Sequence, residues 1–143
     1  MIDVHTDSLL QAGLIEPAQS EWASNVVFVR KSDGSMRCCV DYRHLNERTE
    51  GYYPLPRIDV CLDALAGARW FSTFDLRSGY HQVMLDPKDA DKTTFVTRCG
   101  TFRFRVMPFW LCNAMATFQP LMNVALAGLN PMMCLVYLDD IVH

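Results

Sequence analysis

The sequence lacks the patterns that would point to a zinc protein, a secreted disulfide protein or a membrane protein. Its six cysteines show no Cys-x-x-Cys spacing and no pairing with histidine, which argues against a zinc site and a disulfide framework. No charged leader precedes an apolar stretch, and asparagine, glycine and proline interrupt the most apolar region. We therefore expect an intracellular protein, in the cytoplasm or nucleus, that is neither secreted nor inserted in a membrane.

An overall positive charge is also missing. The net charge is -3 at pH 7, whereas proteins that bind nucleic acid usually carry a basic surface. The distribution is uneven, because basic residues outnumber acidic ones between Arg30 and Arg57. Half of the 143 residues are apolar, which is enough to bury a core in a single domain. Nucleic-acid binding by one basic segment therefore stays open.

Turn residues and apolar periodicity predict an α+β fold. The Asp33-Gly34 pair between two β-rich runs predicts a hairpin with a basic tip. A second hairpin is expected within 93–108, where Phe102, Phe104 and Val106 would share its buried face. Helices are predicted at 4–14, 58–66 and 113–128, strands at 70–76 and 132–142, with a kink or early break at Pro120.

Two adjacent carboxylates, Asp139 and Asp140, lie between apolar residues near the end of the last predicted strand. Successive side chains of a strand face opposite ways, so the pair can serve one site only if the chain turns there. Asp75, at the end of another strand, would complete a cluster for hard divalent cations, and two such ions can clamp a phosphoryl displacement. The alternative is an exposed turn without chemistry.

Six stretches of the sequence carry a resemblance to a known family. They are "GLIEPAQSEWASNVVFVRKSDGSMRCCVDYRHLN", "YYPLPRIDVCLDAL", "FSTFDLRSGYHQV", "KTTFVTRCGTFRFRVMPF", "NAMATFQPLMN" and "VYLDDI". Over nearly its whole length the chain resembles the reverse transcriptase domain of Ty3/gypsy-class LTR retrotransposons. The resemblance implies a right-hand polymerase fold in which residues 1–143 form fingers and palm, with an antiparallel palm sheet, and end after the Tyr-Leu-Asp-Asp hairpin.

The resemblance also implies an activity and its site residues. The activity is RNA-directed DNA polymerisation with two Mg²⁺ ions, acting on an RNA or DNA template-primer and deoxynucleoside triphosphates. Asp75, Asp139 and Asp140 would be the catalytic, metal-binding carboxylates. Lys31 and Arg37 would hold the triphosphate of the incoming nucleotide, and the alternative is that both are solvated surface charges.

Three further residues are implied to bind substrate. Tyr80 would lie under the sugar and discriminate against a 2′-hydroxyl, and its alternative is an ordinary core tyrosine. Phe109 and Gln119 match positions that line the nucleotide pocket and the template side. Nothing in the sequence indicates a specific protein partner.

The sequence departs from the family in two ways. Trp110 and Met115 stand where the family has glycine and proline, and an indole in place of glycine should obstruct nucleotide or template. The family's thumb, connection and RNase H regions would follow His143, so we expect the isolated chain to be inactive. Two alternatives remain, a nucleic-acid-binding module without catalysis and a degenerate remnant of an element.

Overall fold

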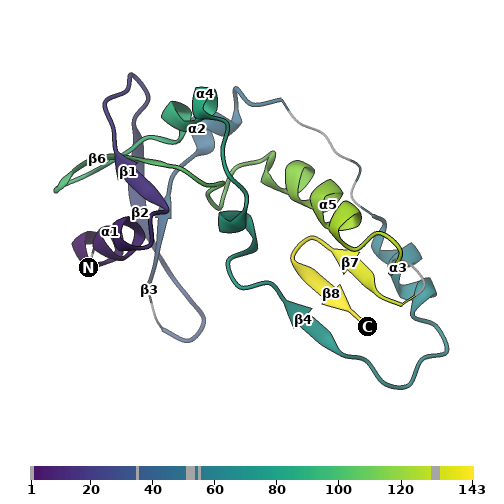
Figure 1. The fold of residues 1–143 in the computed structure, drawn as a ribbon. Helices are drawn as coiled ribbons and strands as arrows, with labels where there is room; N and C mark the ends of the chain where they lie inside the picture. Colours follow the sequence, from purple (N-terminus) through teal and green to yellow (C-terminus); the bar gives the residue numbers. More distant parts are fainter. Residues whose placement is uncertain (1, 35, 51–53, 55, 130–132) are drawn as a thin grey trace. The chain divides into compact units, whose positions relative to one another are not determined.

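The computed structural model, which describes residues 2–34, 36–50, 54, 56–129 and 133–143, forms two compact units. The first comprises Met1–Thr49 and Tyr80–Leu111, and the second Glu50–Gly79 and Cys112–His143. Figure 1 shows the chain coloured along the sequence. The sequence does not reveal this division, because each unit is assembled from two separate segments and no low-complexity linker marks the changes between them.

The first unit contains a five-stranded sheet in the order β1-β6-β5-β2-β3, in which only β2 and β5 pair in parallel. Its strands are β1 (Ile15–Pro17), β2 (Ser24–Arg30), β3 (Met36–Val40), β5 (Phe95–Thr97) and β6 (Gly100–Phe104). Its helices are α1 (Ile2–Gln11), α2 (Arg43–Asn46), α4 (Pro87–Ala90) and η2 (Asp91–Thr93). The 3₁₀ helix η1 (Gly79–Gln82) spans the change from the second unit to the first.

The core of the first unit lies on one face of β5 and β6. Its buried residues are Ile15, Phe95, Phe102, Phe104 and Val106, and leucines of α1 pack against them. The predicted common face of the second hairpin is therefore confirmed. On the opposite face, an arginine at position 103 forms ion pairs with acidic side chains of β1 and η2.

The first hairpin is also confirmed. β2 and β3 pair antiparallel with Arg30 opposite Met36, and Gly34 in the connection has a φ of 83°. An L-residue with a side chain rarely adopts this left-handed conformation, which is why the Asp-Gly signal predicted the turn.

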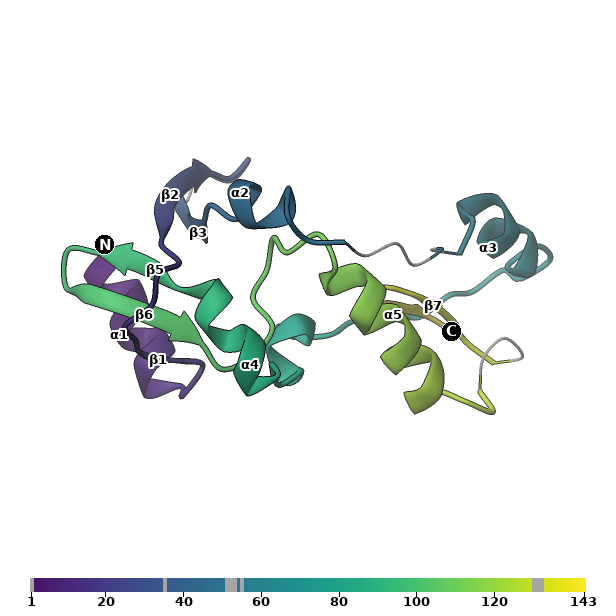
Figure 2. The ribbon, with the colours of Figure 1, turned by 90° about the horizontal axis from the view of Figure 1, so that it is seen from above.

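The second unit contains a three-stranded antiparallel sheet in the order β4-β8-β7. Its elements are α3 (Ile58–Ala64), β4 (Thr73–Asp75), α5 (Ala114–Ala125), β7 (Leu135–Tyr137) and β8 (Asp140–Val142). Helix α5 packs against β7, and the two lie side by side in both views (Figure 1, Figure 2). The helix and sheet together confirm the α+β prediction for this unit.

Helix α5 continues through Pro120 to Ala125, so the early break that the proline suggested does not occur. A proline inside a helix removes one hydrogen bond and costs about 3 kcal/mol. Burial of Phe118, Gln119 and Met122 on the same helix offsets that cost. Among the described residues, no helix is long and apolar enough to cross a membrane.

Candidate active site

The two adjacent aspartates lie on the hairpin formed by β7 and β8. Tyr137 pairs with Asp140, so the connecting turn consists of Leu138 and Asp139. Leu138 has a φ of 57°, the left-handed conformation that two-residue hairpin turns require and that a leucine rarely adopts. The chain therefore turns one residue earlier than the Asp-Asp pair, with Asp139 in the turn and Asp140 at the start of β8.

Asp75 lies directly opposite Asp140 at the end of β4. Opposite residues of an antiparallel pair point to the same face, with Cβ atoms about 4.5–5.5 Å apart. The backbone nitrogen of Leu76 donates a hydrogen bond to the Asp139 carbonyl at 3.1 Å, which joins the end of β4 to the turn. The predicted adjacency of the Asp75 strand and the hairpin that carries Asp139 and Asp140 is confirmed.

The three carboxylates do not form a tight cluster. Asp75 and Asp140 lie opposite each other on paired strands, and Asp139 lies beside them in the turn. Asp75 and Asp140 are exposed, and Asp139 is half-buried. In the part of the chain that the structure describes, no three His, Cys, Asp or Glu side chains gather into a group that could hold a metal ion. Carboxylate oxygens are the ligands that Mg²⁺ prefers, so the donor set fits, and convergence of all three on one cation stays a prediction.

Gln119 of α5 is 0% exposed and hydrogen bonds to this hairpin. Its Oε1 accepts from the backbone nitrogen of Leu138 at 2.7 Å, and its Nε2 donates to the Val136 carbonyl at 3.2 Å. Sequence reasoning assigned Gln119 to the substrate. Direct contact with a substrate stays a prediction, while the structure shows its amide engaged by the backbone beside Asp139.

Sequence reasoning missed Gly79, which is buried between the hairpin and α5. A Cβ at this position would lie 2.9 Å from Cζ of Phe118 and 3.5 Å from Cβ of Asp139. The first distance is too short for a side chain, so only glycine fits. The signal in the sequence was a glycine soon after the Asp75 strand, where the backbone passes close to another element.

Lys31 and Arg37, the residues predicted to hold the triphosphate, lie on the first hairpin and are exposed. Lys31 accepts a hydrogen bond from the Gly34 nitrogen through its carbonyl, and Arg37 pairs with Val29 across the hairpin. Both belong to the first unit, whereas the carboxylates belong to the second. The basic hairpin is confirmed, and its contact with a nucleotide stays a prediction.

Tyr80 and Phe109 are brought together by the structure. Their ring centroids are 5.3 Å apart in an edge-to-face arrangement, and the His81 ring lies 4.8 Å from Phe109. Edge-to-face aromatic pairs stabilise each other beyond their buried area. Two of the residues predicted to bind substrate therefore form one aromatic cluster in the first unit.

Trp110, directly after this cluster, has a φ of 77° and is 54% exposed. Nδ2 of Asn46 donates a hydrogen bond to its carbonyl at 2.8 Å. The left-handed backbone costs an L-residue with a Cβ about 1–2 kcal/mol. Glycine would adopt this conformation without strain, so the backbone supplies a reason for glycine that spacing alone did not reveal.

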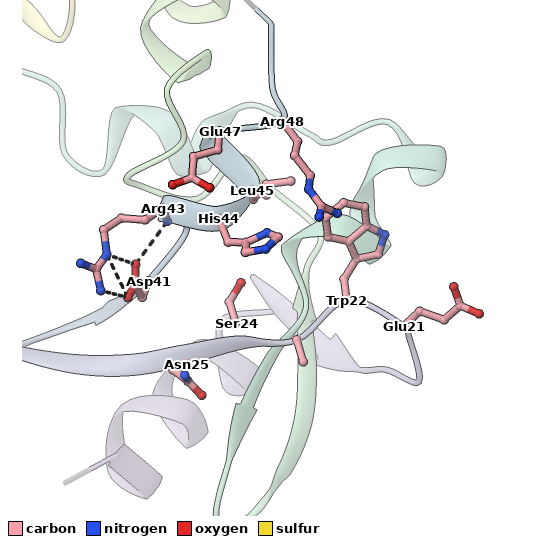
Figure 3. A pocket seen from close by; sticks show the side chains of 11 residues that line it. Glu21, Trp22, Ser24, Asn25, Asp41, Arg43, His44, Leu45, Glu47 and Arg48 are labelled. Carbon is pink, nitrogen blue, oxygen red and sulfur yellow. Dashed lines mark hydrogen bonds and ion pairs between the residues drawn. The ribbon is translucent and has the colours of Figure 1, made fainter.

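A pocket of about 680 Å³ in the first unit was not predicted from the sequence. Figure 3 shows its lining, which includes Trp22, Arg43, His44 and Arg48. Arg43 forms an ion pair with Asp41 at 2.6 Å and lowers the pKa of that carboxyl to about 2. Glu21, Asp41 and Glu47 also line the pocket, so its arginines do not give it a basic surface.

Comparison with known sequences gives concordant matches. Residues 29–143 match the family described as reverse transcriptase (RNA-dependent DNA polymerase). An RNA-directed DNA polymerase homolog from Oenothera berteroana is 53% identical over 109 residues, which cover 76% of this chain and 77% of that protein. The Pol polyproteins of transposons 297 and gypsy from Drosophila melanogaster are 40% and 37% identical, over 99% and 94% of this chain. The chain spans only 14% of each of these two polyproteins.

Comparison with solved structures gives the same family of folds. A prototype foamy virus protease-reverse transcriptase superimposes with a TM-score of 0.84 and 25% identity, over 99% of this chain and 19% of that one. A foamy viral protease-reverse transcriptase in complex with double-stranded DNA superimposes with a TM-score of 0.82 and 23% identity, over 95% of this chain and 24% of that one.

Proposed function

The chain belongs to the reverse transcriptase family, in the branch of Ty3/gypsy-like retrotransposon polyproteins, and from this premise we propose that it forms the nucleotide-transferring part of a polymerase. Its α+β fold is part of the right-hand polymerase fold. In the proposal the first unit corresponds to the fingers and the second to the palm. The reaction is the transfer of a deoxynucleotide to the 3′ end of a primer on an RNA or DNA template.

The observation that carries this proposal is the register of β4 and β8, which sets Asp75 opposite Asp140 beside the Asp139 turn. Reverse transcriptases use divalent metal ions, and Asp75, Asp139 and Asp140 would hold two Mg²⁺ ions here. Bound ions of this kind neutralise charge on the reacting phosphate. The carboxylates supply the negative charge and oxygen donors that the ions require.

Four of the residues proposed to bind substrate lie in the first unit, and Gln119 lies in the second. Lys31 and Arg37 would bind the triphosphate, because exposed cationic side chains on a hairpin can form charge-assisted hydrogen bonds with phosphate oxygens. Tyr80 and Phe109 would contact the sugar and base through their paired rings. Gln119 would act near the template side.

The experiment is a primer-extension assay with Mg²⁺ on the purified chain and on the chain fused to the thumb, connection and RNase H regions of a related polyprotein. We expect the isolated chain to be inactive, because a polymerase must grip the primer-template. The fusion with Trp110 should stay nearly inactive and the fusion with Trp110→Gly should extend primers, because the indole would obstruct nucleotide or template. In the Trp110→Gly fusion, Asp140→Asn should lower activity at least about 100-fold, as expected when a group that acts in the transition state is removed. Asp63→Asn, an exposed aspartate of the same unit, is the matched control.

Trp110 requires a second comparison, because it could disable the fusion independently of the carboxylates. Trp110→Gly should raise the activity of the fusion, since the indole would obstruct nucleotide or template. A fusion that stays inactive both with Trp110 and with Trp110→Gly would contradict the proposed activity. Equal activity of the two forms would instead show that the indole is tolerated.

A second candidate is a nucleic-acid-binding module without catalysis. It is favoured by the exposed basic hairpin that carries Lys31 and Arg37, which can contact phosphates without the three carboxylates. Binding by this module should be weak, insensitive to sequence and steeply dependent on salt, because phosphate contacts would dominate it. Salt-dependent binding without any Mg²⁺-dependent extension by the fusion would favour this candidate.

A further inference from the structure

The buried amide of Gln119 is hydrogen bonded to β7 and to the first residue of the turn that carries Asp139. Its oxygen accepts from the nitrogen of Leu138 at 2.7 Å, and its nitrogen donates to the carbonyl of Val136 at 3.2 Å and to Oδ1 of Asn123 at 3.3 Å. These hydrogen bonds stabilise the fold, because a buried backbone group without a hydrogen-bond partner raises the free energy of the folded state.

The turn itself is strained. Leu138 has a φ of 57° where a glycine or asparagine is the usual choice, and a leucine there is less stable than in an ordinary conformation. Strained residues persist when the surroundings hold them in place. The contacts of the turn come from α5 through Gln119, from the end of β4 through Leu76 and from the close packing at Gly79.

We propose that Gln119 is a positioning residue that holds the Leu138–Asp139 turn in its left-handed conformation and so sets the directions in which Asp139 and Asp140 present their carboxylates. The hydrogen bond from the Leu138 nitrogen fixes the peptide between Tyr137 and Leu138, at the start of the turn. Without it the turn can relax to a conformation in which leucine is unstrained, and the following two side chains rotate with the backbone.

Only one part of this inference rests on the proposed function, namely that the turn presents its carboxylates to a divalent cation. The hydrogen bonds and the strain are properties of the fold and can be tested without catalysis. The inference differs from a substrate role for Gln119, because a residue that touches nucleotide or template would change substrate affinity and leave the turn intact.

The first experiment measures amide hydrogen exchange by NMR on the full chain and on Gln119→Met, which preserves the length of the side chain and removes both hydrogen-bonding groups. We expect the Leu138 amide to exchange slowly in the wild type and about 10- to 100-fold faster in the variant. Thr117→Val, which removes an exposed hydroxyl from the same helix, is the matched control and should leave the Leu138 amide unchanged.

The second experiment measures the affinity of the full chain for Mn²⁺ alone, by electron paramagnetic resonance. Gln119→Met should weaken Mn²⁺ binding about tenfold, and adding Leu138→Gly should recover most of the loss, because glycine adopts the left-handed conformation without strain. A residue that served only as core packing would lower stability without rescue by glycine at position 138.

The outcomes separate this inference from the proposed function. Fast exchange of the Leu138 amide in the wild type, or unchanged exchange in Gln119→Met, overturns the inference. Lost protection in Gln119→Met upholds the turn-holding role even if the wild type binds no Mn²⁺, a result that would count against the proposed catalytic site alone. Should Gln119→Met fail to fold, Gln119→Asn replaces it, since the shorter side chain keeps an amide but loses its reach to Leu138.

Discussion

At position 110, the glycine variant should be more stable than the alanine variant, which is the reverse of the usual order. In a helix or strand, glycine is less stable than alanine by about 0.5–1 kcal/mol, because it loses more conformational freedom on folding. Trp110 has a φ of 77°, where any Cβ costs about 1–2 kcal/mol. Subtracting the entropic cost of glycine, about 0.4–1 kcal/mol, leaves Trp110→Gly more stable than Trp110→Ala by about 0.5–1 kcal/mol.

The comparison removes the indole in both variants, so the packing lost with that half-exposed side chain cancels. Urea unfolding followed by circular dichroism would measure the two midpoints, and equal slopes would show that the unfolding transitions are comparable. The control is the same pair of substitutions at Ser8, an exposed position of α1, where alanine should be the more stable. If alanine were also the more stable at position 110, the left-handed backbone of Trp110 would not exist in solution.

Two further predictions concern other contacts. Gly79→Ala should lower the free energy of unfolding by about 1–3 kcal/mol, because the new methyl group would lie 2.9 Å from the Phe118 ring; an unchanged urea midpoint would show that the ring moves aside. The pKa of Asp41 is lowered to about 2 by Arg43, so the stabilisation from this pair is complete above the ordinary pKa of 3.8 and is lost as the pH falls through about 2. An NMR titration should show this midpoint, and Arg43→Met should return it toward 3.8.

Most elements of the fold were predictable because their signals are local. The Asp-Gly turn, the alternation of Phe102 and Phe104 with arginines, and the start of α5 after Asn113 each depend on residues within a few positions of one another. The break predicted at Pro120 was wrong. The local propensity of proline opposes a helix there, while burial of its neighbours against the hairpin favours one.

The candidate site was less accessible to sequence reasoning. The three aspartates could be named, but the position of the turn depends on which residue of the hairpin adopts the left-handed conformation, and nothing in Leu138 signals it. The contact of Gln119 with Leu138 joins residues on different elements, and so does the close approach of Gly79 to Phe118. Such tertiary distances carry no periodic signal in the sequence.

The order of strands in the second unit has a consequence for synthesis. β8 lies between β4 and β7, yet it is translated after both of them. Neither earlier strand can pair within this sheet until β8 leaves the ribosome, so both keep open hydrogen-bonding edges while translation continues. Backbone hydrogen bonds between Ser72 and His143 then extend the pairing of β4 beyond the end of β8. The strand that brings Asp140 to Asp75 is thus also the strand that ends the period in which β4 and β7 have no partner within their own sheet.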